Sequence, residues 1–275
     1  MLKVATMSPG CPMSTESRLW QMLQVATAAA KGAGAMQKER LWGEHQVSYK
    51  GEVDLVTEVD RECEELIVNS IRDVFPDHNF LAEEAQYPQG IAPYKWIIDP
   101  LDGTTNFAHG FPWFCVSIAL ECEGQLLLGV IYHCMMDELF TAVHGEGAFL
   151  NGKPISVSTR TPLRNSLVAT GFPYDVARDN ENNFGNFVEL QLAARGVRRA
   201  GAAALDLAYV AAGRLDGYWE CKLKPWDVAA GSLLVAEAGG KVTNHAGLPY
   251  SVYDHRILAS NGFIHQEMAR VLNRG

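Results

Sequence analysis

Two segments near the amino terminus of the chain repeat apolar residues every three or four positions. They cover residues 16–40 and 58–75, and the second carries acidic residues on its opposite face. The repeated apolar residues are Leu19, Met22, Leu23, Ala26, Leu66, Ile67, Ile71 and Val74. Because this spacing follows the 3.6-residue turn of a helix, it predicts two amphipathic helices, each with one buried face.

The middle of the chain changes to the pattern of strands. The run KWIID at residues 95–99 is typical of a buried strand, and FCVSIALEC (114–122) and QLLLGVIYHC (125–134) follow it, separated by Glu-Gly. Two apolar runs around a short turn that contains glycine predict a hairpin in an antiparallel sheet. The segment DELFTAVHGEGAFLNGKPI (137–155) is expected to add two more short strands around its glycines.

The second half of the chain alternates strand-like and helix-like segments. The expected strands are NSLVAT (165–170), DGYWE (216–220) and KVTN (241–244), and the expected helices cover about 181–195, 203–213 and 227–238. Alternation of this kind predicts an α/β lobe. Since no repeat, low-complexity tract or Pro/Ser-rich linker interrupts the chain, we expect a single domain over residues 1–275, with an α+β lobe at 16–155 and an α/β lobe at 156–275.

The composition is that of an ordinary globular protein, with 48% hydrophobic and 20% charged residues. Apolar runs such as LLLGVIY (126–132) are strand-length and too short to cross a membrane. The first residues lack the long apolar segment of a signal peptide, so we expect a cytoplasmic protein without a membrane partner. The six cysteines form no C-x-x-C pair, and this indicates buried, reduced thiols rather than disulfides or a zinc site.

The chain carries a formal net charge of −9. This charge argues against direct nucleic-acid binding, because nucleic-acid binders need basic patches that displace counterions. An acidic protein that binds a phosphate ester would need metal ions to neutralise the negative charges of the protein and of the phosphate. The charge therefore gives a first indication of a metal.

The segment WIIDPLDGTTNF (96–107) places two aspartates, Asp99 and Asp102, at the end of an apolar strand. Like charges repel and buried carboxylates are costly, so we expect a cation between these side chains. Gly103 permits a tight turn after which the backbone amides of Gly103 and Thr104 can face an anion. The alternative is that the aspartates cap the following helix, as acids near a helix start commonly do.

Three further acids stand at the ends of predicted elements. Glu83 follows the apolar residues of FLAEEA, Asp227 begins a helix in KPWDVAAGSLLVAEAGG, and Asp60 opens the second helix after DLVTEV. The structural alternatives are a solvated surface acid for Glu83 and a first-turn helix acid for Asp227. If these acids converge with the aspartate pair, their oxygens form a site for a hard cation.

These segments carry a resemblance to a known family. DPLDGTTNFAHGFPWFCVSIAL, LAEEA, DLVTEVD and PWDVAAGSLLVAEAGG resemble the signatures of the inositol monophosphatase family, and the likeness extends over nearly the whole chain. The resemblance implies a layered αβαβα sandwich, the fold of the inositol monophosphatase and fructose-1,6-bisphosphatase superfamily. It also implies a homodimer. Because bacterial relatives are linked to the transcription machinery, it further implies a possible binding partner in that machinery.

The resemblance implies two to three Mg²⁺ ions in one active site. Glu83, Asp99 and the backbone carbonyl of Leu101 would bind the first ion. Asp99, Asp102 and Asp227 would bind the second, so that Asp99 bridges the two ions. Glu83 and waters would hold a third, weaker ion.

The remaining roles also come from the resemblance. Asp60 and Thr104 would orient and activate the attacking water, and Glu83 completes the catalytic set. The phosphate would be received by the amides of Gly103 and Thr104. The residues implied to contact the substrate alcohol are Asp102, Ala203, Glu220 and Asp227.

The implied reaction is the Mg²⁺-dependent hydrolysis of myo-inositol monophosphates by a metal-activated water, with inositol 1-phosphate giving inositol and phosphate. Other phosphorylated polyols and sugars stay open as substrates, because fructose-1,6-bisphosphatase, 3′-phosphoadenosine 5′-phosphate phosphatase and histidinol phosphatase are related activities. A regulatory interaction protein of the transcription machinery is a different class of function. The retained acids favour an enzyme, since acids clustered without a metal reduce stability. Lithium inhibition is implied by the resemblance alone.

The chain departs from the family pattern at a few positions. Ala82 stands where relatives often carry glycine, and Ala202 stands where Ser or Thr is common, so a hydroxyl near the substrate is missing. Lys50 is either the loop lysine of relatives or a solvated lysine. The absent hydroxyl leaves the preferred alcohol open.

Overall fold

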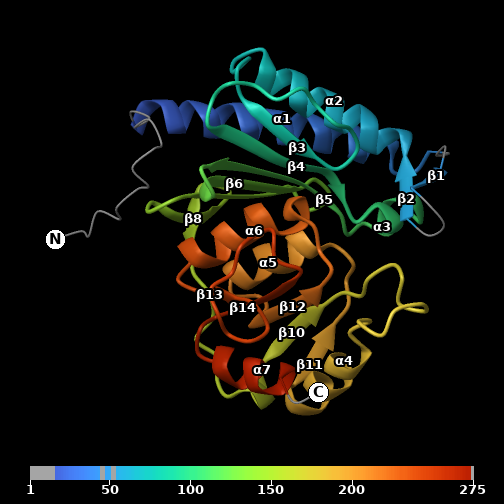
Figure 1. The fold of residues 1–275 in the computed structure, drawn as a ribbon, viewed down its shortest axis with the longest axis vertical. Helices are drawn as coiled ribbons and strands as arrows, with labels where there is room; N and C mark the ends of the chain where they lie inside the picture. Colours follow the sequence, from blue (N-terminus) through green and yellow to red (C-terminus); the bar gives the residue numbers. More distant parts are fainter. Residues whose placement is uncertain (1–15, 44–46, 51–53, 274–275) are drawn as a thin grey trace.

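The computed structural model describes residues 16–43, 47–50 and 54–273, and these residues form five layers (Figure 1). Two helices cover the outer face of a seven-stranded sheet, two lie between this sheet and a five-stranded sheet, and two cover the outer face of the five-stranded sheet. In that order the pairs are α1 (Glu16–Arg40) and α2 (Glu58–Arg72), α5 (Ala203–Ala211) and α6 (Pro225–Glu237), and α4 (Phe184–Ala193) and α7 (His265–Leu272). The layered αβαβα sandwich is thus confirmed.

The seven-stranded sheet has the order β3-β4-β5-β6-β7-β8-β9, in which only β3 and β4 are parallel. Its strands are β3 (Asn79–Ala82), β4 (Tyr94–Asp102), β5 (Cys115–Cys122), β6 (Gln125–His133), β7 (Glu138–Val143), β8 (Gly147–Leu150) and β9 (Lys153–Ile155). The predicted hairpin is the β5–β6 pair. Residues 137–155 form three strands where two were expected, because Asn151 and Gly152 both adopt positive φ and turn the chain back as β9.

The five-stranded sheet has the order β11-β10-β12-β14-β13. Its strands are β10 (Leu167–Thr170), β11 (Gly196–Arg198), β12 (Gly217–Cys221), β13 (Lys241–Thr243) and β14 (Arg256–Ser260). The strands predicted from the pattern are β10, β12 and β13, whereas β11, β14 and α7 lie outside the predicted elements. With three residues, β11 is too short to show a periodic pattern, and short apolar runs such as that of β14 do not distinguish a strand from a helix.

Four short elements flank the layers. These are β1 (Val47–Lys50), which pairs with β2 (Asp54–Thr57), the helix α3 (Thr104–Ala108), and a 3₁₀ turn at Leu163–Asn165. Thr57 caps α2, since its side chain accepts the N–H of Val59 while its own N–H donates to Asp60. The prediction for the Lys50 side chain falls outside the described part of the structure.

The close approach of α6 to the large sheet depends on Gly129 in β6. A Cβ at this position would lie 2.9 Å from the carbonyl oxygen of Ala230 and 3.0 Å from its Cα, and both atoms are backbone atoms that cannot move aside. Because Gly129 has no Cβ, α6 packs against β4, β5 and β6. This packing brings the first turn of α6, which contains Asp227, next to the large sheet.

The cysteine prediction is confirmed for Cys63, Cys115, Cys134 and Cys221, which are free and buried. It is wrong for Cys122, which is disulfide-bonded. Which cysteines pair is set by their proximity in the folded chain, which spacing in the sequence does not reveal. Among the described residues, no helix is both long and apolar enough to span a membrane.

Candidate active site

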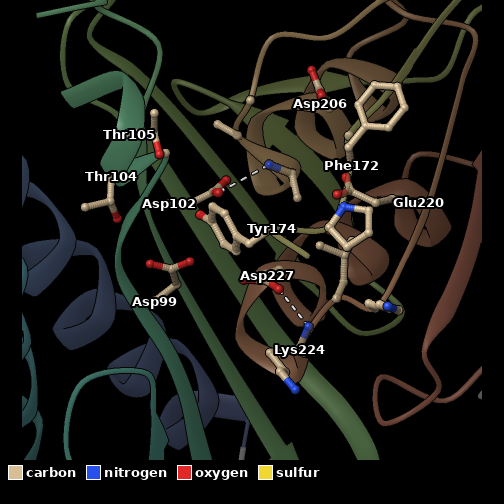
Figure 2. A pocket seen from close by; sticks show the side chains of 18 of the residues that line it. Asp99, Asp102, Thr104, Thr105, Phe172, Tyr174, Asp206, Glu220, Lys224 and Asp227 are labelled. Carbon is tan, nitrogen blue, oxygen red and sulfur yellow. Dashed lines mark hydrogen bonds between the residues drawn. The ribbon is translucent and has the colours of Figure 1, made fainter. Parts of the chain in front are cut away.

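A cavity of about 470 Å³ opens where strand ends from both sheets meet the first turns of three helices. The strands β4, β10 and β12 contribute their carboxyl-terminal ends, and α3, α5 and α6 contribute their amino-terminal turns. The predicted site residues that line it are Glu83, Asp99, Leu101, Asp102, Gly103, Thr104, Ala203, Glu220 and Asp227. Acids from segments far apart in the sequence therefore do converge, and Figure 2 shows several of them around the opening.

A β-bulge at the end of β4 brings Asp99 and Asp102 to the same cavity. Side chains three positions apart in a regular strand point to opposite faces of the sheet. Here Asp99 pairs with Ser117 of β5 and Asp102 pairs with Cys115, so three steps along β4 oppose two steps along β5. The extra residue shifts the alternation, and both carboxylates line the cavity.

The turn after the bulge requires glycine. Gly103 has a φ of 97°, and a Cβ there would lie 2.9 Å from the carbonyl oxygen of Trp113. Only glycine adopts this conformation in this space without strain. The next residues enter α3, so the amides of Gly103 and Thr104 lie at the start of a helix beside the carboxylates.

Asp102 is held by the first turn of α5. Its carboxylate accepts the N–H of Ala203 at 3.2 Å and the N–H of Ala204 at 2.7 Å. The N-cap residue of α5 is Ala202, which has no side-chain acceptor. Asp102 supplies the missing cap from another part of the chain, so the helix-capping alternative is correct in part, although the helix is not the one that follows Asp102.

Asp227 lies in the first turn of α6, as the sequence predicted. Its carboxylate accepts the N–H of Lys224 at 2.7 Å, a capping interaction that also agrees with the structural alternative. The hydroxyl of Ser117, the β5 partner of Asp99, donates to the carbonyl of Trp226 at 3.2 Å. This bond ties the start of α6 to the strand opposite Asp99, so Asp227 and Asp99 share the cavity.

Asp60 does not line the cavity but is linked to it through Thr104. Its Oδ1 lies 2.9 Å from the Thr104 hydroxyl, and its Oδ2 accepts the N–H and the hydroxyl of Thr57 at 2.9 Å and 2.5 Å. The Thr104 hydroxyl also lies 3.1 Å from the carbonyl oxygen of Leu101. Asp60 is buried, so it fixes the orientation of a hydroxyl at the cavity wall.

The cavity carboxyls raise one another's pKa. For Asp99, burial raises the pKa well above its usual value, and the charges of Glu83, Asp102 and Asp227 add to the shift. Burial is also the main cause of the raised pKa of Asp102 and of Asp227, with nearby acids as a further cause in each case. The ionised forms of these side chains are therefore costly without a nearby positive charge.

This donor set fits a hard divalent cation. Carboxylates and a backbone carbonyl are the ligands that Mg²⁺ and Ca²⁺ prefer, and the mutual repulsion at Asp99 is of the kind that a cation relieves. Within the described residues, no three His, Cys, Asp or Glu side chains are gathered closely enough to hold one ion in their present conformations. The acids thus surround a cavity rather than a closed cage, and their side chains would have to turn toward an ion.

The far side of the cavity is formed by Glu220 of β12 and the loop after β10. Glu220 is buried, accepts a short hydrogen bond from the Tyr218 hydroxyl, and has a pKa raised by burial to about 7. A Cβ on Gly171 would lie 2.2 Å from the carboxylate oxygen of Glu220, so glycine leaves the space that this carboxylate occupies. Gly171 directly follows a predicted strand end, which is the sequence signal that could have indicated it.

The cavity is also lined by a buried acid that the sequence analysis did not indicate. Asp206 of α5 is 2% exposed, and its Oδ1 has no hydrogen-bond partner among the described residues. Burial raises the pKa of Asp206 well above its usual value, the charges of Glu220 and Asp102 add to this shift, and Arg199 opposes it. In the sequence, Asp206 resembles an ordinary helix residue among alanines and leucines.

Comparison with known proteins agrees with the fold. The sequence profile of the inositol monophosphatase family matches residues 18–274. An inositol-1-monophosphatase of Synechocystis sp. is 48% identical over 95% of this chain and 92% of its own length, and the Nus factor SuhB of Pseudomonas aeruginosa is 47% identical over 87% and 91%. The structure of an inositol monophosphatase from Anabaena (Nostoc) sp. superposes with a TM-score of 0.84 at 45% identity, covering 93% of this chain and 96% of that one.

The layered fold, the acid-lined cavity and these matches define the protein as a phosphatase, a hydrolase of phosphate esters. The chain belongs to the inositol monophosphatase family. This family is generally metal-dependent, which agrees with the donor set of the cavity.

Proposed function

We propose that the protein hydrolyses myo-inositol monophosphates to inositol and phosphate by direct attack of water, with Mg²⁺ as its cofactor. The observation that carries the proposal is the gathering of Glu83, Asp99, Asp102 and Asp227 with the carbonyl of Leu101 around one cavity. The identity to an inositol-1-monophosphatase over nearly the whole chain supports this substrate.

Five residues would hold the metal. Glu83, Asp99 and the Leu101 carbonyl form one ligand group, and Asp99, Asp102 and Asp227 form the other, as the family resemblance implies. When bound, two or three Mg²⁺ ions supply neutralisation of the phosphate charge and a water of lowered pKa. The oxygen donors and the raised pKa of Asp99 agree with this assignment.

The protein itself orients the attacking water. The Thr104 hydroxyl donates its proton to Asp60 at 2.9 Å, which leaves its lone pairs directed to a proton of the water. Asp60 is held on its other side by the N–H and the hydroxyl of Thr57, and these contacts restrict its rotation. Amides at the Gly103–Thr104 turn lie beside this pair, where they would position the phosphate oxygens.

The alcohol of the substrate lies on the far side of the cavity. Glu220 accepts hydroxyl hydrogen bonds there, and its orientation is set by the Tyr218 hydroxyl. Asp102, Asp227 and the first turn of α5 at Ala203 complete the contacts. Since Ala202 offers no hydroxyl, selectivity for the polyol depends mainly on these carboxylates.

A panel of phosphate esters in Mg²⁺ tests the proposal. We expect inositol 1-phosphate to give a higher kcat/KM than fructose 1,6-bisphosphate, 3′-phosphoadenosine 5′-phosphate and histidinol phosphate. A clear preference for one of those three esters would replace the substrate while keeping the reaction. If the folded protein hydrolysed none of these esters, the proposed catalytic activity would be wrong.

The second candidate function is regulatory and rests on the similarity to the Nus factor SuhB. It requires binding to a component of the transcription machinery, and it is compatible with an active phosphatase site. The expected homodimer, the cytoplasmic location, the lithium sensitivity and the division into two lobes of one domain stay predictions that rest on the sequence.

A further inference from the structure

Glu64 of α2 is a buried acid that lies outside the cavity. Its carboxylate binds the segment that carries Glu83. Glu64 is 1% exposed. Its Oε2 accepts the N–H of Glu84 at 2.7 Å, and its Oε1 accepts the N–H of Ala85 at 2.8 Å and the hydroxyl of Tyr87 at 2.9 Å. All three donors follow Glu83 within four residues.

The backbone of Glu83 is therefore fixed on both sides. On the amino-terminal side, Ala82 is the last residue of β3 and pairs with Ile98 of β4. On the carboxyl-terminal side, the N–H of Glu84 is bound to Glu64. Hydrogen bonds to an ionised carboxylate are about twice as strong as those between neutral groups, so these contacts restrict the position of Glu83.

The same face of α2 serves a second segment of the site. Asp60 lies one helical turn before Glu64, and residues four apart point to the same side of a helix. Asp60 orients Thr104, and Glu64 holds the segment after Glu83. Two buried acids on one helix thus set the relative position of two cavity walls.

We propose that Glu64 is a positioning residue that fixes the Glu83 carboxylate for binding a divalent cation. This inference rests on the proposed function, in which Glu83 is a metal ligand. Glu64 does not line the cavity. It acts through the backbone amides of Glu84 and Ala85, and the Tyr87 hydroxyl fixes the carboxylate that accepts them.

The test compares Glu64→Gln with Glu65→Gln, which removes the same charge from the neighbouring exposed position of α2. A glutamine side chain accepts hydrogen bonds only at its carbonyl oxygen. Its NH₂ group is a donor, so it cannot accept the hydrogen bonds that the second carboxylate oxygen of Glu64 accepted. Direct binding of Mn²⁺, counted by electron paramagnetic resonance, gives the metal affinity without turnover. Hydrogen exchange of the Glu84 and Ala85 amides in metal-free protein reports the segment itself.

For Glu64→Gln we expect Mn²⁺ affinity to fall about 10–100-fold, as is typical when a group that orients a metal ligand is changed. The two amides should exchange faster, while kcat at saturating metal stays close to that of the wild type. Glu65→Gln should leave the affinity and both amides unchanged. A merely structural role would lower the melting temperature but leave the Mn²⁺ affinity of the folded protein unchanged.

Tyr87→Phe provides a milder variant, because it removes one of the three donors and keeps the charge. It should lower Mn²⁺ affinity by less than Glu64→Gln does. A folded Glu64→Gln with wild-type Mn²⁺ affinity would overturn the positioning role, and if that variant does not fold, wild-type affinity in Tyr87→Phe would do the same. A wild-type protein that binds Mn²⁺ but hydrolyses no inositol phosphate would instead overturn the proposed substrate only.

Discussion

The carboxylate of Asp102 accepts the backbone N–H of Ala204 at 2.7 Å and thereby caps α5 from the end of β4. A residue of the large sheet thus completes a helix that packs between the two sheets. The interaction joins the two halves of the chain at the cavity itself. It also orients an acid that we propose as a metal ligand, so folding and site geometry depend on the same contact.

Asp99→Asn should lower kcat/KM by at least about 100-fold, because even changes to groups around a metal ligand commonly cost about 10–100-fold. The melting temperature of the metal-free protein should rise, since the substitution removes a charge that Glu83, Asp102 and Asp227 repel. Steady-state kinetics and thermal unfolding in EDTA measure the two effects. Asp77→Asn, on an exposed loop, is the matched control. Near-normal activity of Asp99→Asn would contradict the bridging assignment.

Divalent cations should stabilise the folded protein. A ligand that binds only the native state adds about 2.7 kcal/mol at a concentration 100 times its Kd. The melting temperature should therefore rise with Mg²⁺ relative to EDTA at matched ionic strength, and Asp227→Asn should reduce the rise. An equal rise in the wild type and in Asp227→Asn would place the stabilising ion outside this cavity.

Asp206→Asn should change the pH dependence of stability. The folded-state pKa of Asp206 is raised, so the folded protein holds a proton that the unfolded chain releases above about pH 4. Wild-type stability therefore falls as pH rises from that point toward the raised pKa, by at most about 1.4 kcal/mol per pH unit from this group.

The comparison for Asp206 uses urea unfolding at pH 5 and pH 8. The asparagine variant should gain stability relative to the wild type as the pH increases, whereas Glu189→Gln, on the exposed side of α4, should follow the wild type at both values. A difference between Asp206→Asn and the wild type that is the same at both pH values would show that Asp206 does not hold this proton.

Gly171→Ala should weaken recognition of the alcohol. The new Cβ would meet the Glu220 carboxylate and displace it from its hydrogen bond with Tyr218. Losing the hydrogen bond between a substrate hydroxyl and this carboxylate costs about 1.5–3 kcal/mol, which corresponds to a KM about 10–140-fold higher for inositol 1-phosphate. A simple aryl phosphate, which lacks hydroxyls for Glu220, should be affected much less. Equal losses on both substrates would argue against the placement of the alcohol.

Local patterns in the sequence were sufficient for most of the elements. The helical spacing of residues 16–40 matches α1, and the hairpin around Glu-Gly matches β5 and β6. The layered arrangement followed from the resemblance rather than from periodicity. Elements of three to five residues, such as β11 and β14, were not found, because their patterns are too short to be distinctive.

The acids of the site were found because each stands at the end of an apolar run, where side chains leave the core. The residues that orient them were not found. Glu64 resembles an exposed acid of an amphipathic helix, and Gly171 an ordinary loop glycine. Their contacts are with residues distant in the sequence, at Glu84 and Glu220, and no local pattern encodes such pairs.

The sequence by itself determined which residue types stand at strand and helix ends, because hydrophobic spacing and turn chemistry are local properties of the chain. Only the tertiary structure decided that Asp99 and Asp102 face the same cavity, since this depends on a bulge in β4 that appears in its pairing with β5. It also decided that Asp102 caps α5 and that Glu64 holds the segment after Glu83. The physical reason is that burial and hydrogen-bond partners are set by which segments pack together, and that packing is a property of the whole fold.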